Sequence, residues 1–469
     1  MIGLKKTPME KSVKRKKVIF RRFASYANEG GTTVLGGVGG ENAALYESGT
    51  LYAKRSENCD FSDDCLQQGA KAEILMTSAK NTVKNIPTDN VTNVFCVRMP
   101  GEDGTSIFER YLIALNTGYV HLYDEATKSF SAKTLVGNYA QGTLIRAVSG
   151  VQAYLMIGNK KGTFIKSDEE FYPAVRANMT NVFCLCKNRL FVFCRDGKLV
   201  YSDPMNPLDM SVSIDNGGYI TLPLALGNPV ALTGVGEYVY VLFRRAIMRL
   251  KVQGSARDFY LEELPYAGGK IVGGSACAID NGVIFLAHDG LWKVQGREMK
   301  RFCEAFTPNP YAQDIGCNAA ICQGKYFLRY PTKNSIFLSV AVDLDGQSWS
   351  YCHDLVGLNV GFDTPVFVKN GTLYQLGGNA LPDGEVALFE SMDTDFGMRG
   401  KKTLRRLELL GEGSVTVKIY YDGRFVERDV EFVDGKAVLE IGVRGERFSF
   451  AFEIGHRSVL RGMGAELEG

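Results

Sequence analysis

Four histidines are the first side chains to consider for catalysis, because acyl transfer by a triad needs a histidine near a nucleophile and an orienting acid. They are His121, His288, His353 and His456. The first two lie beside predicted hairpin turns, and none stands in a glycine-flanked serine elbow or in a metal-ligand spacing. We therefore expect ordinary surface or loop histidines, and we predict that the protein is not an enzyme.

Paired carboxylates are the second kind of candidate, since glycoside hydrolases place two of them across the scissile bond. The acidic groups within residues 60–64 and 168–170 fall in predicted loops, where carboxylates are mostly solvated. Residues 343–349 come near the aspartate-box turn of sialidases, but Leu344 stands in place of the aspartate and Val342 in place of the serine. A carbohydrate-binding or glycosidase-type propeller therefore stays an alternative function.

Metal and cofactor sites have little support in the sequence. The eleven cysteines are scattered, and neither a Cys-x-x-Cys pair nor a histidine cluster accompanies Cys184 and Cys186. The glycine cluster at 36–40 lacks the Lys-Ser/Thr that follows in a P-loop. We predict no metal and no cofactor.

A basic segment opens the chain, with nine lysines and arginines in the first 22 residues and Glu10 as the only acid. One interpretation is a mobile, solvated tail. The other is a contact with nucleic acid or with an acidic neighbouring subunit, and both interpretations stay open. The candidate contact residues are Lys14, Arg15, Lys16, Lys17, Arg21 and Arg22. The whole chain has a formal net charge of only +2, so any attraction to polyanions is local.

The elements that position these side chains are predicted from internal repeats. Seven segments share an apolar strand, a short polar turn and a second apolar strand, at residues 111–123, 153–165, 190–201, 238–252, 282–294, 325–342 and 365–376. Turns such as Asp196-Gly197 and Asp289-Gly290 are strong hairpin signals, because type I′ turns need positive φ at both central residues. The turn centres lie roughly 36 to 48 residues apart, close to the period of four-stranded propeller blades.

An isolated hairpin would leave one apolar face in water, whereas sheets stacked radially bury both faces. We therefore predict an all-β fold, with a β-propeller of six to eight blades, seven favoured, over residues 51–383. A basic, glycine-rich arm over 1–50 precedes it. Strands such as that of Val415, Val417 and Ile419 alternate with polar residues, which predicts a small C-terminal β-sandwich over 384–469.

Targeting signals are not visible in the sequence. The basic start is not followed by the apolar run of a secretory signal peptide. No stretch approaches the roughly 20 apolar residues that span a bilayer, so we expect no membrane-spanning segment and synthesis in a cytoplasm.

Three stretches carry a resemblance to a known family. Residues 202–207 match the serine-aspartate-proline turn of certain propellers, although the tryptophan often found downstream is absent. Residues 273–292 match one of their blades, and residues 404–423, 447–454 and 462–466 match a terminal β-domain. In these stretches the sequence resembles the tail hub or nozzle proteins of short-tailed bacteriophages, also called packaged-DNA stabilisation proteins.

The resemblance implies a structural role in a virion tail. It implies a homo-oligomeric ring, with a hexamer favoured, below the portal and the head-to-tail adaptor and in contact with other tail proteins. Phage DNA would pass through the lumen, which stays closed until infection, and the protein would be made in the bacterial host cytoplasm. A cytosolic scaffold of the WD-repeat kind should show Gly-His and Trp-Asp signatures in each blade, and neither recurs.

Overall fold

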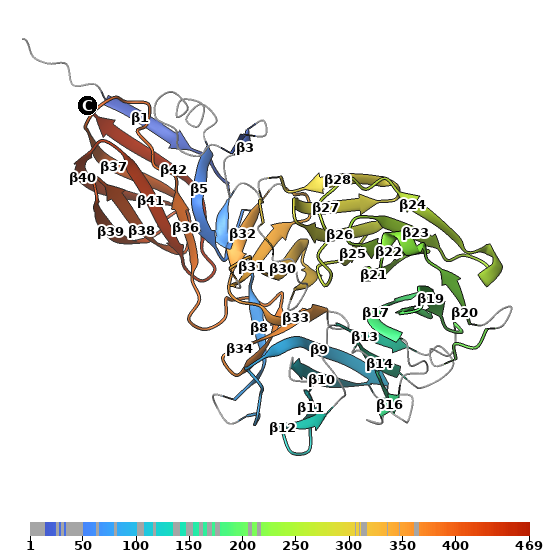
Figure 1. Cartoon of the computed structure of the whole chain (residues 1–469). Helices are drawn as coiled ribbons and strands as arrows, with labels where there is room; N and C mark the ends of the chain where they lie inside the picture. The colour runs from blue at the N-terminus through green and yellow to red at the C-terminus, as the bar shows by residue number, and fades with distance from the viewer. Residues whose placement is uncertain are drawn as a thin grey trace, which may run out of the picture. The chain divides into compact units, whose positions relative to one another are not determined.

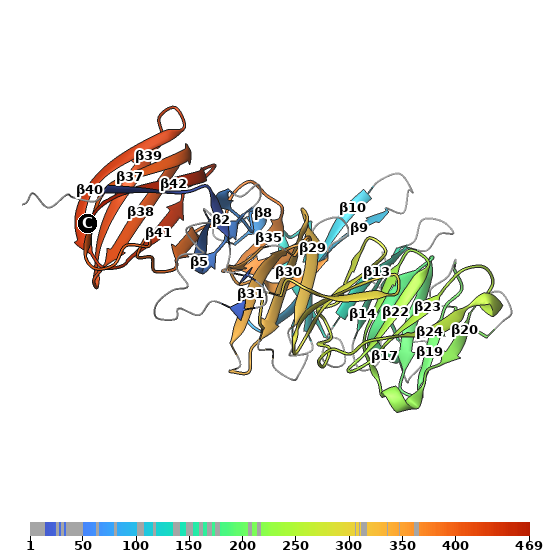
Figure 2. The ribbon, with the colours of Figure 1, turned by 90° about the horizontal axis from the view of Figure 1, so that it is seen from above.

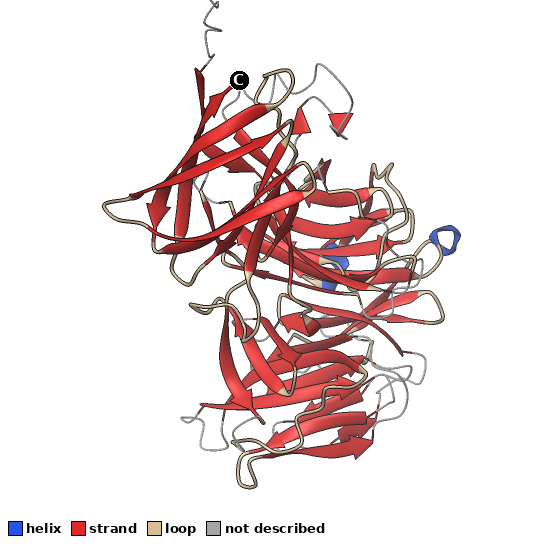
Figure 3. Ribbon diagram, turned by 90° about the vertical axis from the view of Figure 1, so that its left-hand side faces the viewer, coloured by secondary structure: helices blue, strands red, loops and turns tan. Residues whose placement is uncertain are grey.

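The structure is a computed structural model. It describes residues 15–24, 28–29, 32–33, 50–61, 65–78, 82–100, 107–115, 119–134, 141–146, 153–158, 163–166, 171–173, 179–204, 209–212, 217–304, 306–308, 310, 317–334, 336–346, 348–360 and 365–469. Two compact units divide the chain, one formed by Ala70–Pro382 and the other by Met1–Gly69 together with Asp383–Gly469. Strands dominate both units (Figure 3), and the only helices among the described residues are two 3-10 turns, η2 (Leu224–Leu226) and η3 (Ala256–Asp258). None of the helices in these ranges is long and apolar enough to cross a membrane.

In the described part of Ala70–Pro382 the strands form seven four-stranded antiparallel sheets. The first three contain β9 (Val91–Pro100), β10 (Ile107–Leu115), β11 (Tyr119–Asp124) and β12 (Ser129–Thr134); β13 (Gln141–Arg146), β14 (Ala153–Gly158), β15 (Thr163–Lys166) and β16 (Phe171–Pro173); and β17 (Met179–Cys186), β18 (Arg189–Cys194), β19 (Lys198–Tyr201) and β20 (Gly218–Thr221). The fourth and fifth contain β21 (Pro229–Val235), β22 (Tyr238–Phe243), β23 (Ile247–Lys251) and β24 (Tyr260–Leu264); and β25 (Cys277–Ile279), β26 (Gly282–Ala287), β27 (Gly290–Gln295) and β28 (Glu298–Phe302). The last two contain β29 (Asn318–Cys322), β30 (Lys325–Pro331), β31 (Phe337–Asp343) and β32 (Trp349–Cys352); and β33 (Val356–Val360), β34 (Pro365–Lys369), β35 (Thr372–Leu376) and β8 (Ala72–Thr77).

Each of the seven predicted hairpins forms the two central strands of one of these sheets. Central strands are covered on both faces, which explains why they stand out in the sequence as continuous apolar runs. Every residue of β18 and of β26 is buried, for example. The predicted propeller class is confirmed, and it has the favoured seven blades.

The blades close into a ring through their innermost strands. Each of β9, β13, β17, β21, β25, β29 and β33 contacts the next, and β33 contacts β9. Figure 1 shows the sheets following one another in colour order, and the blue β8 pairs with β35 at the edge of the last sheet. The seventh blade is therefore completed by a strand that precedes the first blade in sequence.

Side chains reinforce this closure. Thr77 Oγ1 lies 3.2 Å from Thr372 Oγ1, and Ser78 Oγ donates to the carbonyl oxygen of Gly371 at 2.8 Å. Asn318 Nδ2 donates to the carbonyl oxygen of Thr92 at 3.1 Å. The first two contacts fasten β8 to the rest of the seventh blade, and the third joins the sixth blade to the first.

The second unit is a sandwich of two sheets. One has the order β40 (Lys436–Gly445), β37 (Lys402–Glu412), β42 (Val459–Glu468), β7 (Leu66–Gln68) and β6 (Cys59–Asp60), with β1 (Arg15–Phe20) paired to β42. The other has the order β5 (Thr50–Glu57), β36 (Ala387–Ser391), β41 (Phe448–Ile454), β38 (Ser414–Tyr421) and β39 (Arg424–Glu431), with β2 (Arg22–Ala24) parallel to β5. A separate two-stranded ladder joins β3 (Asn28–Glu29) and β4 (Thr32–Thr33). Figure 2 shows the strands β37 to β42 of this unit together, and their pairing divides them between the two sheets.

The sandwich differs from the predicted domain boundaries, because it includes residues 51–69, which we expected in the propeller. The predicted arm over 1–50 also contributes strands to it. Apolar contacts explain the difference: the Phe23 ring packs edge-on against Phe389 and Phe452, with centroids 5.6 and 6.1 Å apart. Pairing with β1 and β5 also covers strand edges that would otherwise be left open.

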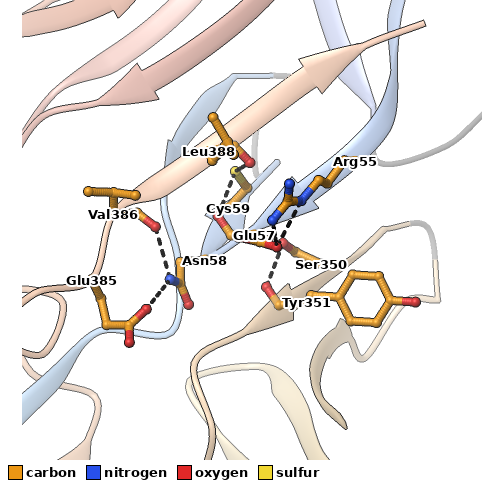
Figure 4. A network of polar contacts seen from close by, with 9 residues as sticks. All are labelled: Arg55, Glu57, Asn58, Cys59, Ser350, Tyr351, Glu385, Val386 and Leu388. Carbon is orange, nitrogen blue, oxygen red and sulfur yellow. Dashed lines mark hydrogen bonds and ion pairs between the residues drawn. The ribbon is translucent and has the colours of Figure 1, made fainter.

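Polar contacts hold the β5–β6 connection in the same unit (Figure 4). Asn58 Nδ2 donates to the carbonyl oxygen of Val386 at 2.9 Å and to Glu385 Oε2 at 3.2 Å. The Cys59 thiol donates to the carbonyl oxygen of Leu388 at 3.2 Å. The sandwich is therefore assembled from segments near both ends of the sequence.

Candidate interaction surfaces

Three of the six predicted contact residues lie on one strand of the sandwich. Arg15, Lys16 and Lys17 belong to β1, and Arg21 and Arg22 follow directly, while Lys14 lies outside the described residues. β1 runs antiparallel to β42, with Arg15 opposite Glu468 and Lys17 opposite Glu466. Within the described residues, the basic segment is thus a strand of a sheet beside an acidic strand end.

The lysines of β1 bind acceptors of their own chain. Lys17 Nζ lies 3.2 Å from Glu408 Oε2, and Glu408 Oε1 also receives Lys436 Nζ at 2.9 Å. The hydrogen bonds from Lys436 and Lys17 hold the pKa of Glu408 below its usual range. Lys16 Nζ donates to the carbonyl oxygen of Phe396 at 2.8 Å. A contact of this strand with nucleic acid or with another subunit stays a prediction.

A buried lysine, Lys402, holds the turn between β36 and β37. Lys402 is 1% exposed, and its Nζ donates to the carbonyl oxygens of Asp395 at 2.9 Å, Met398 at 2.7 Å and Glu446 at 2.7 Å. Burial lowers the pKa of Lys402, while the negative charges of Asp395 and Glu446 act in the other direction and raise it in part. Phe396, in the same turn, is fully buried with a φ of 55°, so the turn is fixed by both packing and charge.

A different set of cations gathers on the propeller. Arg244 and Arg245 form the turn between β22 and β23, His288 lies in the turn between β26 and β27, and Lys333 lies in the turn between β30 and β31. Lys270 lies in the connection from β24 to β25. Because successive strands are antiparallel, these turns and this connection lie at the same end of their sheets. We call these five residues the basic turn cluster.

Backbone hydrogen bonds place the segments of Arg244, Lys270 and His288 side by side. The amide of Ile271 donates to the carbonyl oxygen of Arg244 at 2.9 Å, and the amide of His288 donates to that of Lys270 at 3.0 Å. Burial, and then the charges of Lys270, Lys333 and Arg244, lower the pKa of His288. The three cations are thus close enough for each to act on one imidazole.

Aromatic and acidic groups support the middle of the cluster. Asp289 Oδ1 accepts from Trp292 Nε1 at 3.1 Å, and the Trp292 ring meets Tyr266 edge-on with centroids 5.2 Å apart. Arg301 donates to the carbonyl oxygen of Asp289. Sequence reasoning missed this cluster, because its members lie in four separate turns and connections of three blades and share no local motif.

The opposite ends of the same sheets carry more acid. Glu237 and Asp280 lie in the turns that join the first and second strands of the fourth and fifth blades. Lys187, in the corresponding turn of the third blade, pairs with Glu237 at 4.0 Å, and Arg257 lies in η3. The basic turn cluster therefore gives one end of these blades a local positive charge that the other end lacks.

The stretch near an aspartate box is a turn of the sixth blade. Asp343, rather than Leu344, supplies its carboxylate, which receives Lys325 Nζ on one oxygen and Ser348 Oγ on the other. The amide of Gly346 donates to the carbonyl oxygen of Asp343 at 2.8 Å. Both carboxylate oxygens are thus used within the fold.

The histidines lie in different surroundings. His353 is in the loop between β32 and β33, as predicted, but it is only 5% exposed, with its ring centroid 5.2 Å from that of Phe367, while His456 is exposed. His121 belongs to β11, and burial lowers its pKa. Within the described residues, no three histidine, cysteine or acidic side chains are grouped so that they could hold a metal ion.

A pocket of about 310 Å³ opens on the sandwich, lined by β38, β39 and β41 and by the residue before β36. Its acidic side chains are Asp429, Glu431 and Glu453. Asp429 Oδ1 accepts from Thr416 Oγ1 at 2.7 Å, and Glu453 Oε1 lies 3.8 Å from Lys418 Nζ. These acids are thus engaged at least in part by their own sheet.

Comparisons with known proteins give likeness of fold only. No family model matches the chain, and no curated protein matches it. A crystal structure of BBS1N in complex with ARL6DN aligns with a TM-score of 0.44 and 10% identity, over 66% of this chain and 99% of that one. BamB from Moraxella catarrhalis aligns with a TM-score of 0.37 and 11% identity, over 67% and 99%. Raptor from Chaetomium thermophilum aligns with a TM-score of 0.39 and 11% identity, over 63% of this chain and 29% of that one.

Proposed function

We propose that this protein is a structural component of a bacteriophage tail, a hub or nozzle subunit that forms a homo-oligomeric ring below the portal and adaptor. The observation that carries the proposal is a combination of sequence and fold. Among the described residues of the stretches that resemble tail hub proteins, 202–204 follow the third strand of the third blade and 273–292 belong to the fifth blade of the propeller. The stretches 404–423, 447–454 and 462–466 lie in the terminal β-sandwich. Function still has to be argued from surfaces, because propellers serve many unrelated purposes.

A tail subunit of this kind acts through shape and through contacts. Closed rings need a heterologous interface, in which one surface of a subunit meets a different surface of the next. The sandwich offers one surface for such contacts, the rim of the pocket that carries Asp429, Glu431 and Glu453. The strand β8 pairs with β35 and closes the propeller, which gives this unit a rigid frame.

Assembly is the property to measure first. The purified full chain is examined by light scattering and negative-stain microscopy, alone and with DNA-filled phage heads, with heads lacking their tail adaptor as the control. We expect rings, or a monomer that assembles only on heads carrying the adaptor.

A monomer that ignores heads at every concentration overturns the tail proposal. In that case a glycan array and a hydrolysis screen test the carbohydrate-binding or glycosidase-type propeller. Glycan binding that depends on loop aromatic residues would establish that alternative.

A further inference from the structure

We propose that the basic turn cluster of the propeller binds the phosphate backbone of duplex DNA. The inference deepens the proposed function, and it rests on that function only for the choice of duplex DNA as the polyanion. The site is distinct from the basic strand β1, because it lies on the turns of the fourth to sixth blades.

Rigid turns present the cations of the cluster. The amide of Phe243 donates to the carbonyl oxygen of Ala246 at 2.9 Å and closes the turn that carries Arg244 and Arg245. The amide of Thr332 donates to that of Ile336 at 2.8 Å and closes the turn that carries Lys333. The cationic groups therefore need little backbone ordering when they bind, which lowers the entropic cost of association.

The balance of charge favours an anionic ligand. Arg244, Arg245, Lys270 and Lys333 are all exposed, and Asp289 is the acid in the turn between them. Among the described residues, no carboxylate lies within ion-pair distance of Arg245, Lys270 or Lys333. Like charges held together on a surface repel one another, and the negative charge of phosphate groups relieves that repulsion. Binding also releases the counterions of the DNA, which favours association.

The kind of surface favours nucleic acid over protein. Stable protein interfaces have a core depleted of charge and rich in aromatic side chains, with the charges at the rim. In this cluster the charges of Arg244 and Lys270 are at the centre, and the exposed apolar Ile336 belongs to the outlying turn. Arginines and lysines on loops are the usual source of contacts with DNA phosphates, and a guanidinium can bind two phosphate oxygens at once.

Salt dependence gives the proposal a number. Four side chains that each neutralise one phosphate predict a slope of log affinity against log salt of about −3.6 for duplex DNA. Between 50 and 200 mM salt that slope is a loss of roughly 150-fold in affinity. Removing two cations should halve the slope, so that the loss falls to roughly 12-fold.

The experiment measures fluorescence anisotropy of a labelled duplex with the full chain across this salt range. The test variant is Arg244→Ser/Arg245→Ser, and the matched control is Lys187→Ser/Arg257→Ser, which removes two exposed cations from the opposite ends of blades. All three proteins keep the same N-terminal lysines and arginines, so any difference in slope reports on the propeller. Tryptophan fluorescence melts confirm that each variant is folded, because both tryptophans lie in the propeller.

We expect the slope to fall by about 1.8 in the test variant and to stay unchanged in the control. Equal slopes in all three proteins overturn the inference, and so does an equal fall in the control. Competition by polyglutamate that is as strong as competition by unlabelled duplex would identify an acidic protein as the partner instead. If the slopes behave as expected but no rings form on heads, the inference stands and the tail proposal fails. If rings form on heads but the slopes are equal in all three proteins, the tail proposal stands and the inference fails.

Discussion

Replacing Lys402 with methionine tests whether a buried ammonium group holds the β36–β37 turn. Methionine keeps the length and the apolar stem of the side chain but removes the three hydrogen bonds to the carbonyl oxygens of Asp395, Met398 and Glu446. Each buried acceptor left without a donor costs about 1–3 kcal/mol. Part of that loss is offset, because an ammonium group no longer has to be desolvated. We therefore expect the free energy of unfolding of the sandwich to fall by about 3–4 kcal/mol.

The measurement combines urea unfolding followed by far-UV circular dichroism with hydrogen exchange of the peptide that spans 393–401. Tryptophan fluorescence, which reports on the propeller alone, serves as an internal reference. The matched control is Lys401→Met, because Lys401 Nζ lies 3.6 Å from Asp422 with 63% of its side chain exposed. Exposed pairs of this kind contribute about 0–1 kcal/mol. A loss below about 1 kcal/mol for Lys402→Met, or equal losses in both variants, would refute the reasoning.

Three further predictions concern the propeller. Gly282→Ala should lower the free energy of unfolding by about 3 kcal/mol, since its Cβ would overlap the carbonyl oxygen of Val294, and a urea titration followed by tryptophan fluorescence measures this. Burial raises the pKa of the Cys277 thiol to about 12, so iodoacetamide at pH 8 should leave it unmodified until urea unfolds the blade, as read by mass spectrometry. Burial alone would raise the pKa of Glu262, but hydrogen bonds from Arg249 and Arg297 hold it below its usual range. Glu262 therefore stabilises the fold above its unfolded pKa of about 4.3, and this stability is lost as the pH falls through the lower folded pKa. The melting temperature of Glu262→Gln should therefore depend less on pH between about 3 and 5 than that of the unmodified protein.

The central hairpins could be predicted because their signal is local. Strands covered on both faces need continuous apolar runs, and turns such as Asp289-Gly290 need residues that tolerate positive φ, here 136° at Gly290. The innermost and outermost strands are shorter and more mixed: β25 has three residues, and β28 is largely exposed. Their pairing is decided by the neighbouring central strand, so the seven four-stranded sheets emerge only in three dimensions.

Strands of the sandwich that come from the start of the chain could not be predicted, because their partners are distant in the sequence. β1 alternates buried Val18 and Phe20 with exposed residues, but the surrounding lysines and arginines made the segment look like a solvated arm. Its partner β42 lies at the other end of the chain, and no local pattern indicates that pairing. The basic turn cluster was hidden for the same reason, because residues 244, 270, 288 and 333 come together only through the order of the blades.

Both units are completed by pairing strands from distant parts of the sequence. β8 closes the seventh blade against β35, while β1 and β5 complete the sandwich by pairing with β42 and β36. Such contacts require closure of long loops, which slows folding but costs little extra free energy as the loop lengthens. Once these pairs have formed, strands from the start of each unit's sequence are hydrogen-bonded to strands from its end. They can separate only if those hydrogen bonds break. Resistance of this kind suits the proposed role as a tail subunit, because such a subunit would have to keep its shape while DNA passes.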